Sequence, residues 1–303
     1  MIINTANLTA LRTGFSTAFK NGLGRAAPMA DRIATTVPAS TKEQRYGWIN
    51  KIANVREWLG ARVVQNISES DYSIREKPWE LTLGVDRDDI ETDNLGIYSP
   101  LFEQLGQTAA SHSERLVWSQ LKAGFTTNCY DGQFFFDTDH PVLDTDGVTV
   151  LSVANTDGGS GAPWFLLDVS QVLKPIILQV RRPISDIIAK DKPTDDNVFD
   201  RNEYVYGVDG RYNVGFGLWQ FAWGSKQPLN AANYAIARAA LLGMKGDGGD
   251  PLGVGASGKK LLLVVPPTYE SAGRKLLASA LGSGGETNEW ADSAELLMVP
   301  WLA

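Results

Sequence analysis

The chain has 303 residues, a formal net charge of −7, 43% hydrophobic residues and 21% charged residues. These values describe a folded protein with enough chain for one to three domains, and they exclude a largely disordered one. The acidic balance argues against broad adhesion to nucleic acid, which needs a basic face. No apolar run approaches the roughly 18–20 residues that a membrane helix requires.

The first 45 residues contain one short amphipathic pattern and several helix breakers. Leu8, Leu11, Phe15 and Phe19 recur at three- and four-residue steps, which predicts a helix with one apolar face. The segment from Ala34 to Thr41 predicts an extended linker. The simplest interpretation of the helix is that it packs on its own domain.

Short strands and polar turns are predicted between residues 45 and 90. Residues 46–48 and 62–67 predict strands, and residues 50–58 predict one or two helical turns. Residues 79–86 alternate apolar and polar side chains, which predicts a half-exposed strand. A two-stranded hairpin is only marginally stable alone, so one that projects from the core needs partner chains.

An acidic run follows, with five acids among the eight residues from Asp86 to Asp93. Clustered carboxylates can bind a divalent cation. They also favour the first turn of a helix, and we prefer this solvated turn as the interpretation.

A long helix is predicted over residues 99–123, which we call the spine helix. Ser99 and Pro100 suit the N-cap and first helical position, and Gly124 suits the residue after the last turn. At 1.5 Å per residue its length would be roughly 35 Å. The expected apolar face consists of Leu101, Leu105, Ala109, His112, Leu116, Val117 and Leu121. A second stripe is small enough for another backbone to lie close, and it consists of Gly106, Ala109, Ala110 and Ser113.

A turn, a short aromatic strand and a proline stop are predicted from Tyr130 to Val142. Residues 164–168 and 174–180 predict ordered strands, and residues 183–203 predict a polar loop or hairpin. The aromatic, glycine-rich segment 203–223 predicts a hairpin that turns at Asp209-Gly210.

The last 74 residues predict a compact α/β unit. A helix is expected from Asn230 to Met244, followed by a glycine-rich loop at 246–258. Its close-packed face would consist of Ala231, Ala235, Ala239 and Leu242. A buried strand at 260–265, a helix at 269–281 and a strand at 295–299 complete the unit.

Two motifs could carry chemistry, and we discount both. Residues 253–260 match G-x-G-x-x-G and most of a phosphate-binding loop, but a strand follows the loop instead of preceding it. Lys260 also occupies the position where Ser or Thr would hold magnesium. Asp137, Asp139 and His140 could bind a metal or supply an acid and a base. In an extended segment the two aspartates would share one side and His140 would face the other, so an anchoring turn is the better interpretation.

The lone cysteine, Cys129, excludes an internal disulfide and a zinc site of several thiolates. We expect Cys129 to be a small buried side chain with no catalytic role. No metal, cofactor or catalytic residue is therefore predicted.

Several of these segments together resemble one family. The chain is similar to the Mu-like prophage major head subunit (gpT) family in the spine helix and in six further segments. These are residues 84–91, 129–141, 230–234, 244–249, 264–267 and 299–303. The resemblance implies an α+β protein with the Hong Kong-type major capsid fold of tailed-phage and herpesvirus shells.

The resemblance also implies a domain organisation. It assigns an N-terminal arm on a neighbouring subunit to residues 1–45, which we favour because of the linker at 34–41. Residues 46–90 are assigned to an extended loop, which contains the projecting hairpin and a strand. Residues 91–227 are assigned to a peripheral domain with the spine helix and the late hairpin. Residues 228–303 are assigned to an axial domain. Because Trp and Arg are common interface anchors, we expect inter-subunit contacts at Trp48, Arg56, Trp58, Arg62, Arg75 and Trp79. For any single tryptophan, packing in its own core stays an equal alternative.

One feature differs from the wider fold. The block from Trp164 to Trp223 precedes the block from Asn230 to Ala303, whereas many capsid relatives have the opposite order. We interpret this as a circular permutation of the axial part, which requires Ala303 to lie near Trp164.

The function that the resemblance implies is structural. The chain is expected to form hexamers and pentamers of an icosahedral shell around double-stranded DNA, with a scaffold protein, a portal and a possible maturation protease as partners. Assembly is expected in the host cytoplasm, and the product is the virion. The alternatives are a nanocompartment shell of the same fold and a nucleotide-binding enzyme that uses residues 253–260.

Overall fold

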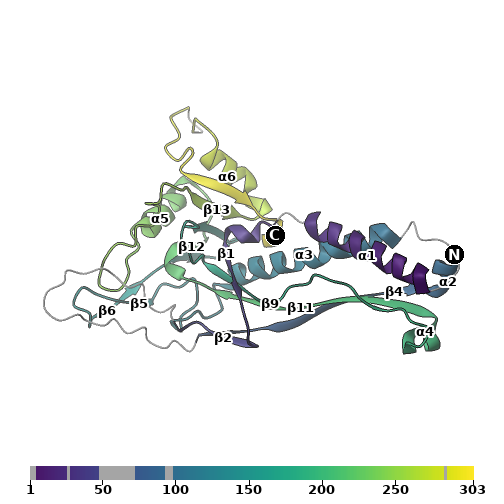
Figure 1. Ribbon diagram of the computed structural model, residues 1–303. Coiled ribbons are helices and arrows are strands. Elements are labelled where there is room, and N and C mark those ends of the chain that lie inside the picture. The colour runs from purple at the N-terminus through teal and green to yellow at the C-terminus, as the bar shows by residue number, and fades with distance from the viewer. Residues whose placement is uncertain (1–4, 26–27, 48–71, 93–97, 283–284) are drawn as a thin grey trace.

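The computed structural model describes residues 5–25, 28–47, 72–92, 98–282 and 285–303. It is an elongated molecule in which two long helices lie along a long sheet, with an α/β unit at one end (Figure 1). The helices are α1 (Thr5–Arg25), α2 (Arg87–Glu91), α3 (Tyr98–Ala123), α4 (Asp196–Arg201), α5 (Ala231–Leu242) and α6 (Glu270–Leu277). Among these described residues, no helix is both long and apolar enough to cross a membrane.

Within the described ranges, the strands form two five-stranded sheets and two short pairs. The long sheet contains β1 (Ala34–Pro38), β4 (Lys77–Asp86), β9 (Ile176–Arg182), β10 (Ile188–Lys190) and β11 (Glu203–Phe216). The second sheet contains β7 (Thr156–Gly159), β8 (Trp164–Leu167), β12 (Ala222–Lys226), β13 (Leu261–Val265) and β14 (Ala294–Met298). The pairs are β2 (Glu43–Arg45) with β3 (Ser73–Arg75), and β5 (His140–Leu143) with β6 (Val150–Val153).

The spine helix is confirmed as α3, and Ala109, Val117 and Leu121 of its predicted face are buried, but the buried face differs near the start of the helix. Leu101 is exposed, whereas its neighbour Phe102 is fully buried and stacks on Phe15 of α1. The small stripe is confirmed at Gly106, where a Cβ atom would lie 2.1 Å from the Phe19 carbonyl oxygen of α1. The side that receives α1 is therefore the one with the aromatic and small residues.

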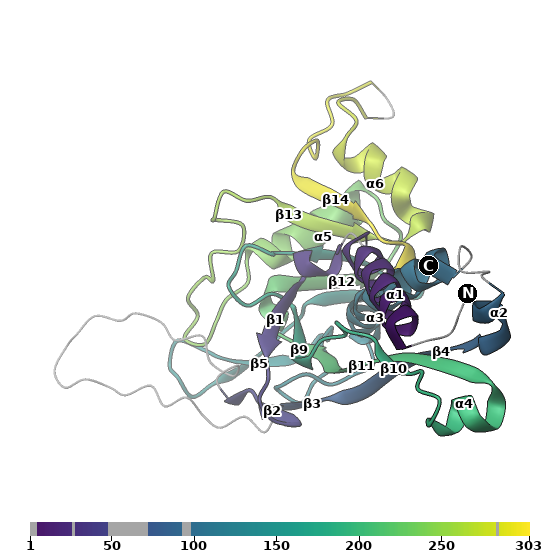
Figure 2. The ribbon, with the colours of Figure 1, turned by 45° about the vertical axis from the view of Figure 1, so that its right-hand side comes forward.

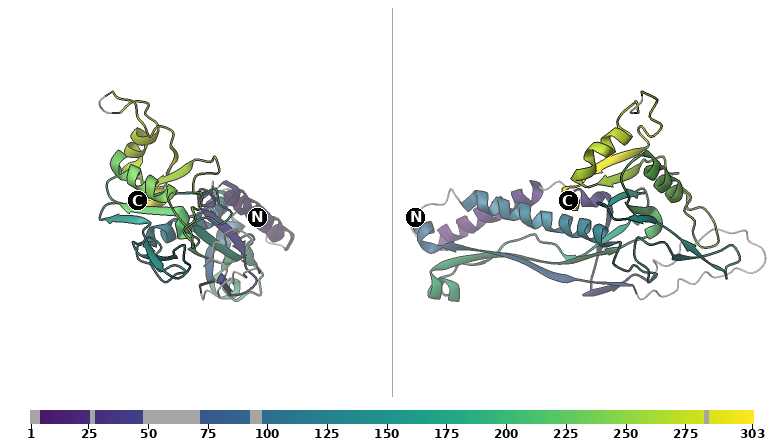
Figure 3. Two further views of the ribbon diagram at one scale, coloured as in Figure 1. Left: turned by 90° about the vertical axis from the view of Figure 1, so that its left-hand side faces the viewer. Right: turned by 180° about the vertical axis from the view of Figure 1, so that it is seen from behind.

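Helix α1 packs on α3 of its own chain, as the simplest interpretation predicted, and the arm on a neighbouring subunit stays a prediction. Its predicted apolar face is buried, with Phe19 fully covered and Phe15 nearly so. The linker expected at residues 34–41 is wrong over residues 34–38, because these form β1 and pair in parallel with β9. Figure 3 shows α1 beside α3 from behind and from one end. Burial of the aromatic face keeps this helix on its own core.

The expected hairpin at Asp209-Gly210 is wrong, because β11 continues without a turn from Glu203 to Phe216. Residues 203–212 pair with β4, and residues 211–216 pair with β9. A Cβ atom at Gly210 would lie 2.7 Å from the ring of Tyr212, so glycine serves close packing here. The strand predicted at 79–86 is confirmed as part of β4, whereas its expected partner at 62–67 lies outside the described residues.

The second sheet confirms the strands β13 and β14 and the helix between them. Every residue of β13 is buried, and β13 pairs in parallel with β14 in a strand–helix–strand unit. However, three strands of this sheet come from residues 156–226, so the expected boundary at 228 cuts across it. In α5 the buried residues are Tyr234, Ala237 and Leu241, so the alanine face predicted for this helix is wrong.

The strand register bears on the expected permutation. Val264 of β13 lies opposite Phe165 of β8, and Val265 lies opposite Met298 of β14. The end of β14 and the start of β8 therefore lie at the same end of the sheet, two strands apart, or roughly 10 Å. This is the proximity that a permutation requires, and the permutation itself stays a prediction.

Candidate functional site

Two of the six predicted contact residues lie in the described part of the chain, and they differ in their surroundings. Arg75, on β3, is exposed. The indole N–H of Trp79 donates to the Tyr212 carbonyl at 2.9 Å, and its ring centroid lies 4.4 Å from that of His112. Trp79 therefore packs in its own chain as well as being partly exposed. Trp48, Arg56, Trp58 and Arg62 lie outside the described residues.

Exposed apolar side chains mark two surfaces that the sequence patterns did not single out. One is the β5–β6 hairpin, where Val148 is 80% exposed and Val150 62%. The other is the far end of the long sheet, where Phe199 of α4 is 83% exposed and Ile188 of β10 is 62% exposed. Figure 2 shows α4 at the end of β10 and β11. Phe199 was missed because it is the only aromatic residue in the polar segment 183–203.

The short helix α4 is held to the end of the long sheet by side-chain hydrogen bonds. The Asn197 amide donates to the carbonyl groups of Lys190 and Glu203, at 2.9 and 2.7 Å. Helix α4 ends at its C-cap residue Asn202, which has a left-handed backbone conformation with φ 54°. Phe199 thus projects from a fixed element.

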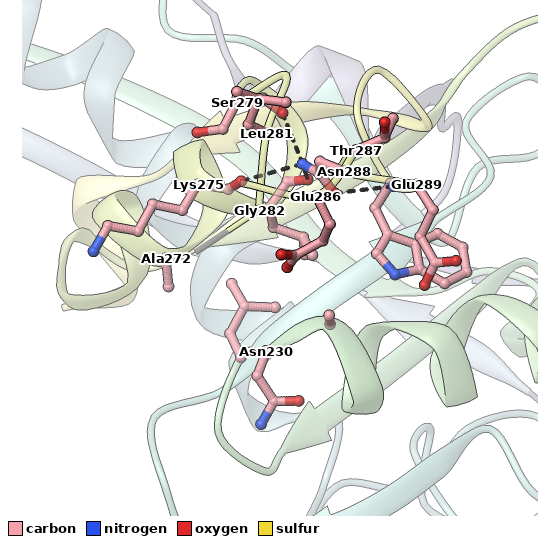
Figure 4. Close-up of a pocket in the computed structure, with 14 residues that line it drawn as sticks. Asn230, Ala272, Lys275, Ser279, Leu281, Gly282, Glu286, Thr287, Asn288 and Glu289 are labelled. Atoms are coloured by element: carbon pink, nitrogen blue, oxygen red, sulfur yellow. Dashed lines mark hydrogen bonds between the residues drawn. The ribbon is translucent and has the colours of Figure 1, made fainter. Parts of the chain in front are cut away.

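A hollow of about 870 Å³ lies between the start of α5 and the loop after α6 (Figure 4). Asn288 fixes this loop, since its amide nitrogen donates to the carbonyls of Ser279 at 2.8 Å and Leu276 at 2.9 Å. Glu286, Glu289 and Lys275 line the opening. The hollow shapes the surface at the tip of the α/β unit. Among the described residues, no ion pair joins Lys275 to Glu286 or Glu289.

The Asp137–His140 segment has the orientation predicted for a strand. A hydrogen bond between the Asp137 and Asp139 carboxyl groups raises the pKa of Asp139, so these two side chains meet. His140 faces the interior, where it is fully buried and stacks on Trp219 with ring centroids 3.9 Å apart. Its Nδ1–H donates to Asp131 Oδ2 at 2.7 Å.

Asp131 is the partner that the sequence patterns missed, although it lies in the same turn as Cys129. The Cys129 thiol donates to Asp131 Oδ1 at 3.0 Å. Burial raises the pKa of this thiol, with Asp131 adding to the effect, so Cys129 is held protonated. The burial of Cys129 agrees with the expected small buried side chain.

The glycine-rich loop 253–260 is engaged by the protein itself. The Gly255 amide donates to Asp168 Oδ2 at 3.1 Å, and the Lys260 ammonium group pairs with Asp292. Burial raises the pKa of Asp168, but hydrogen bonds from Ser170 and Gly255 outweigh it and lower the pKa overall. The loop leads directly into β13, so its amides are not presented at a helix N-terminus.

Comparison with known proteins identifies the family of this chain. The profile of the Mu-like prophage major head subunit gpT matches residues 8–302. The chain belongs to the Mu-like gpT family. The major capsid protein of Escherichia phage Mu is 38% identical over 310 residues and covers 100% of both chains. The Mu-like prophage FluMu major head subunit of Haemophilus influenzae is 42% identical over 278 residues, 90% of this chain and 89% of that one.

Solved structures of phage capsids support the same assignment for this gpT member. The bacteriophage JBD30 procapsid chain is 39% identical, with a TM-score of 0.86 over 99% of this chain and 100% of that one. The JBD30 capsid chain is 30% identical, with a TM-score of 0.76 over 100% of both. The expected major capsid fold is therefore confirmed. This gpT protein is a shell-forming major capsid protein and a component of the virion.

Proposed function

We propose that this chain assembles as hexamers and pentamers into an icosahedral head that encloses double-stranded DNA. The observation that carries the proposal is the fold shared over the whole chain with a procapsid subunit, at a TM-score of 0.86. The role is structural, and we propose no catalytic step and no cofactor.

The mechanism rests on the shape of the subunit. Helices α1 and α3 on the long sheet make a stiff, elongated body, and the second sheet with α5 and α6 makes a separate compact end (Figure 1). We propose that the compact ends gather around each local symmetry axis while the elongated bodies connect neighbouring subunits. Contacts between different surfaces of identical chains close a ring, and many modest contacts stabilise the shell.

Six side chains are proposed to contribute inter-subunit contacts. Arg75 is the described residue that fits best, because it is exposed on β3. Trp79 is proposed as a shared residue that also packs on its own chain. The other four are Trp48, Arg56, Trp58 and Arg62.

The partners follow from the same proposal. The net charge of −7 suits a shell that encloses DNA without specific binding, because a basic lining would hold the packaged polymer. A scaffold protein, a portal and a maturation protease would act during assembly in the host cytoplasm. A JBD30 capsid is decorated with minor capsid protein trimers, and we propose that an equivalent protein binds this shell.

The test is sedimentation velocity and electron microscopy on the purified chain, with and without a co-expressed scaffold. We expect rings or closed shells. Arg75→Ala should lower the assembled fraction and leave the unfolding free energy of the subunit unchanged. A chain that stays monomeric in every condition would overturn the proposal. Shells that enclose a protein cargo in place of DNA would favour the nanocompartment.

A further inference from the structure

Three different metal-ligating side chains converge in the turn that follows the spine helix. The thiol of Cys129, the carboxylate of Asp131 and the imidazole of His140 place one ligand atom each within 4.8 Å of one another. The first two come from a tight turn closed by the hydrogen bond from the Cys129 amide to the Gln133 carbonyl, at 2.8 Å. Gly132 allows this turn because its φ is +90°.

The third side chain is brought in by the start of β5. His140 is followed by Pro141, and it pairs with Val153 at the first position of the β5–β6 hairpin. Trp219 stacks on the ring and fixes its plane. Two segments and a stacked tryptophan therefore hold the three groups in one arrangement.

The cluster is removed from water. His140 is 0% exposed and Cys129 is 6% exposed, and the Asp131 side chain retains 10%. Burial of a carboxylate is costly unless it is compensated, and here each carboxylate oxygen accepts a hydrogen bond from one of the other two groups. A cation would lie between these ligand atoms and take the place of the two shared protons.

We propose that Cys129, Asp131 and His140 bind one divalent transition-metal ion of the zinc class. The set of one sulfur, one imidazole nitrogen and one carboxylate oxygen suits borderline metals such as Zn²⁺ and Co²⁺, and not Mg²⁺ or Ca²⁺. Ligand bonds of about 2.0–2.3 Å require ligand atoms roughly 3.3–3.8 Å apart. The two hydrogen-bonded pairs, at 3.0 and 2.7 Å, would therefore have to open when the ion binds.

The charge and proton balance of the exchange is simple. The ion replaces the thiol proton, which leaves to solvent, and the Nδ1 proton, which moves to Nε2 of the same ring. One proton is released for each ion bound. The thiolate and the carboxylate then carry two negative charges against the two positive charges of the ion, so the buried cluster is neutral.

The second ring nitrogen is free to receive the displaced proton, and the metal bonds must offset the cost of a buried N–H without an acceptor. Among the described residues, His140 Nε2 is buried and has no hydrogen-bond partner. The polar contact that fixes the ring is the one to Asp131, and the metal bonds would replace both this contact and the hydrogen bond from the Cys129 thiol to Asp131. The ion would join the turn after α3 to β5 and so stabilise residues 129–140. This site is independent of the proposed DNA-filled shell.

The test uses the full-length protein after treatment with a chelator. Co²⁺ is added as the probe, because thiolate ligation gives a near-ultraviolet charge-transfer band and tetrahedral geometry gives intense visible bands. We expect one equivalent of Co²⁺ to bind, Zn²⁺ to displace it, and the unfolding temperature to rise with added Zn²⁺. Elemental analysis after dialysis against Zn²⁺ measures the stoichiometry on the unaltered chain, so the result does not depend on any variant folding.

Variants locate the site. Cys129→Ser should abolish the charge-transfer band and weaken binding by at least about tenfold, and His140→Asn should weaken it similarly. The control is Asp137→Asn, which alters a carboxyl of the same segment outside the cluster and should leave binding unchanged. Failure of the unaltered protein to bind Co²⁺ or Zn²⁺ would overturn the proposal, and the cluster would then be a hydrogen-bonded turn only. Binding that persists in Cys129→Ser would overturn it as well.

Discussion

At the scale of single residues, a buried carboxylate joins the N-terminal segment to the spine helix. Glu114 of α3 accepts the Ala30 amide hydrogen, with 2.9 Å from the nitrogen to each oxygen, and the Trp118 indole N–H at 3.1 Å. Burial raises the pKa of Glu114, and these hydrogen bonds only partly oppose it. The folded state is therefore less stable when Glu114 is ionised than when it is protonated.

This residue predicts a pH-dependent contribution to stability. The folded state binds the Glu114 proton more tightly than the unfolded state, so stability should rise as the pH falls from neutral through the raised pKa toward the ordinary value of 4.5. Glu114→Gln removes the titration. The unfolding free energy of the unaltered chain minus that of the variant should grow as the pH is lowered from about 7 to 5 in denaturant titrations. A difference that is constant with pH would show that Glu114 ionises alike in both states.

At the scale of elements, the crossing of α1 and α3 depends on two glycines. A Cβ atom at Gly22 of α1 would lie 1.9 Å from the Glu103 carbonyl oxygen, and one at Gly106 of α3 would lie 2.1 Å from the Phe19 carbonyl oxygen. Both clashes are with backbone, which cannot move aside like a side chain. The two helices can be this close only without side chains at these positions.

Alanine substitutions in α1 separate close packing from helix propensity. Gly22→Ala should destabilise the chain by about 1–3 kcal/mol, because the helices must move apart. Gly14→Ala is the matched control, since nothing lies within 4 Å of its Cβ position, and it should stabilise the same helix by up to about 1 kcal/mol. Denaturant unfolding measures both values. Equal effects of the two substitutions would contradict the proposed contact.

At the scale of the whole molecule, the most exposed aromatic side chain of the described residues lies at the far end of the long sheet. Phe199 is 83% exposed on a helix that is fixed to β10 and β11 by Asn197. A subunit that forms a shell exposes such groups when it is alone and covers them in the assembly. We therefore expect Phe199 to contact another copy of the chain.

Phe199→Ser should leave the unfolding free energy within about 0.5 kcal/mol of the original, because the ring is exposed in the subunit. It should lower the yield of shells in sedimentation and electron microscopy. Phe199→Leu is the control, since it keeps an apolar group and should retain most of the yield. Normal shell yield from Phe199→Ser would place this side chain outside the subunit contacts.

Local patterns predicted the elements that depend on neighbours in sequence. The spine helix follows from Pro100 near its start and an unbroken helical pattern, and α5 follows from Asn230, whose side chain accepts the Asn233 amide hydrogen at 2.9 Å. The acidic run behaves as expected, because Asp86 accepts the Asp88 amide hydrogen at the start of α2. In each case the deciding interaction spans only a few residues.

The amino-acid sequence by itself determined the family, the spine helix, the strands β4 and β13 and the orientation of His140 relative to Asp137. Tertiary structure alone decided which surface covers α1, which face of α5 is buried, and that β11 runs through Asp209-Gly210 without turning. It also decided that Asp131 joins Cys129 to His140. The physical reason is that helix periodicity and capping are local, whereas strand partners and buried polar pairs depend on chain segments that meet only in the folded molecule.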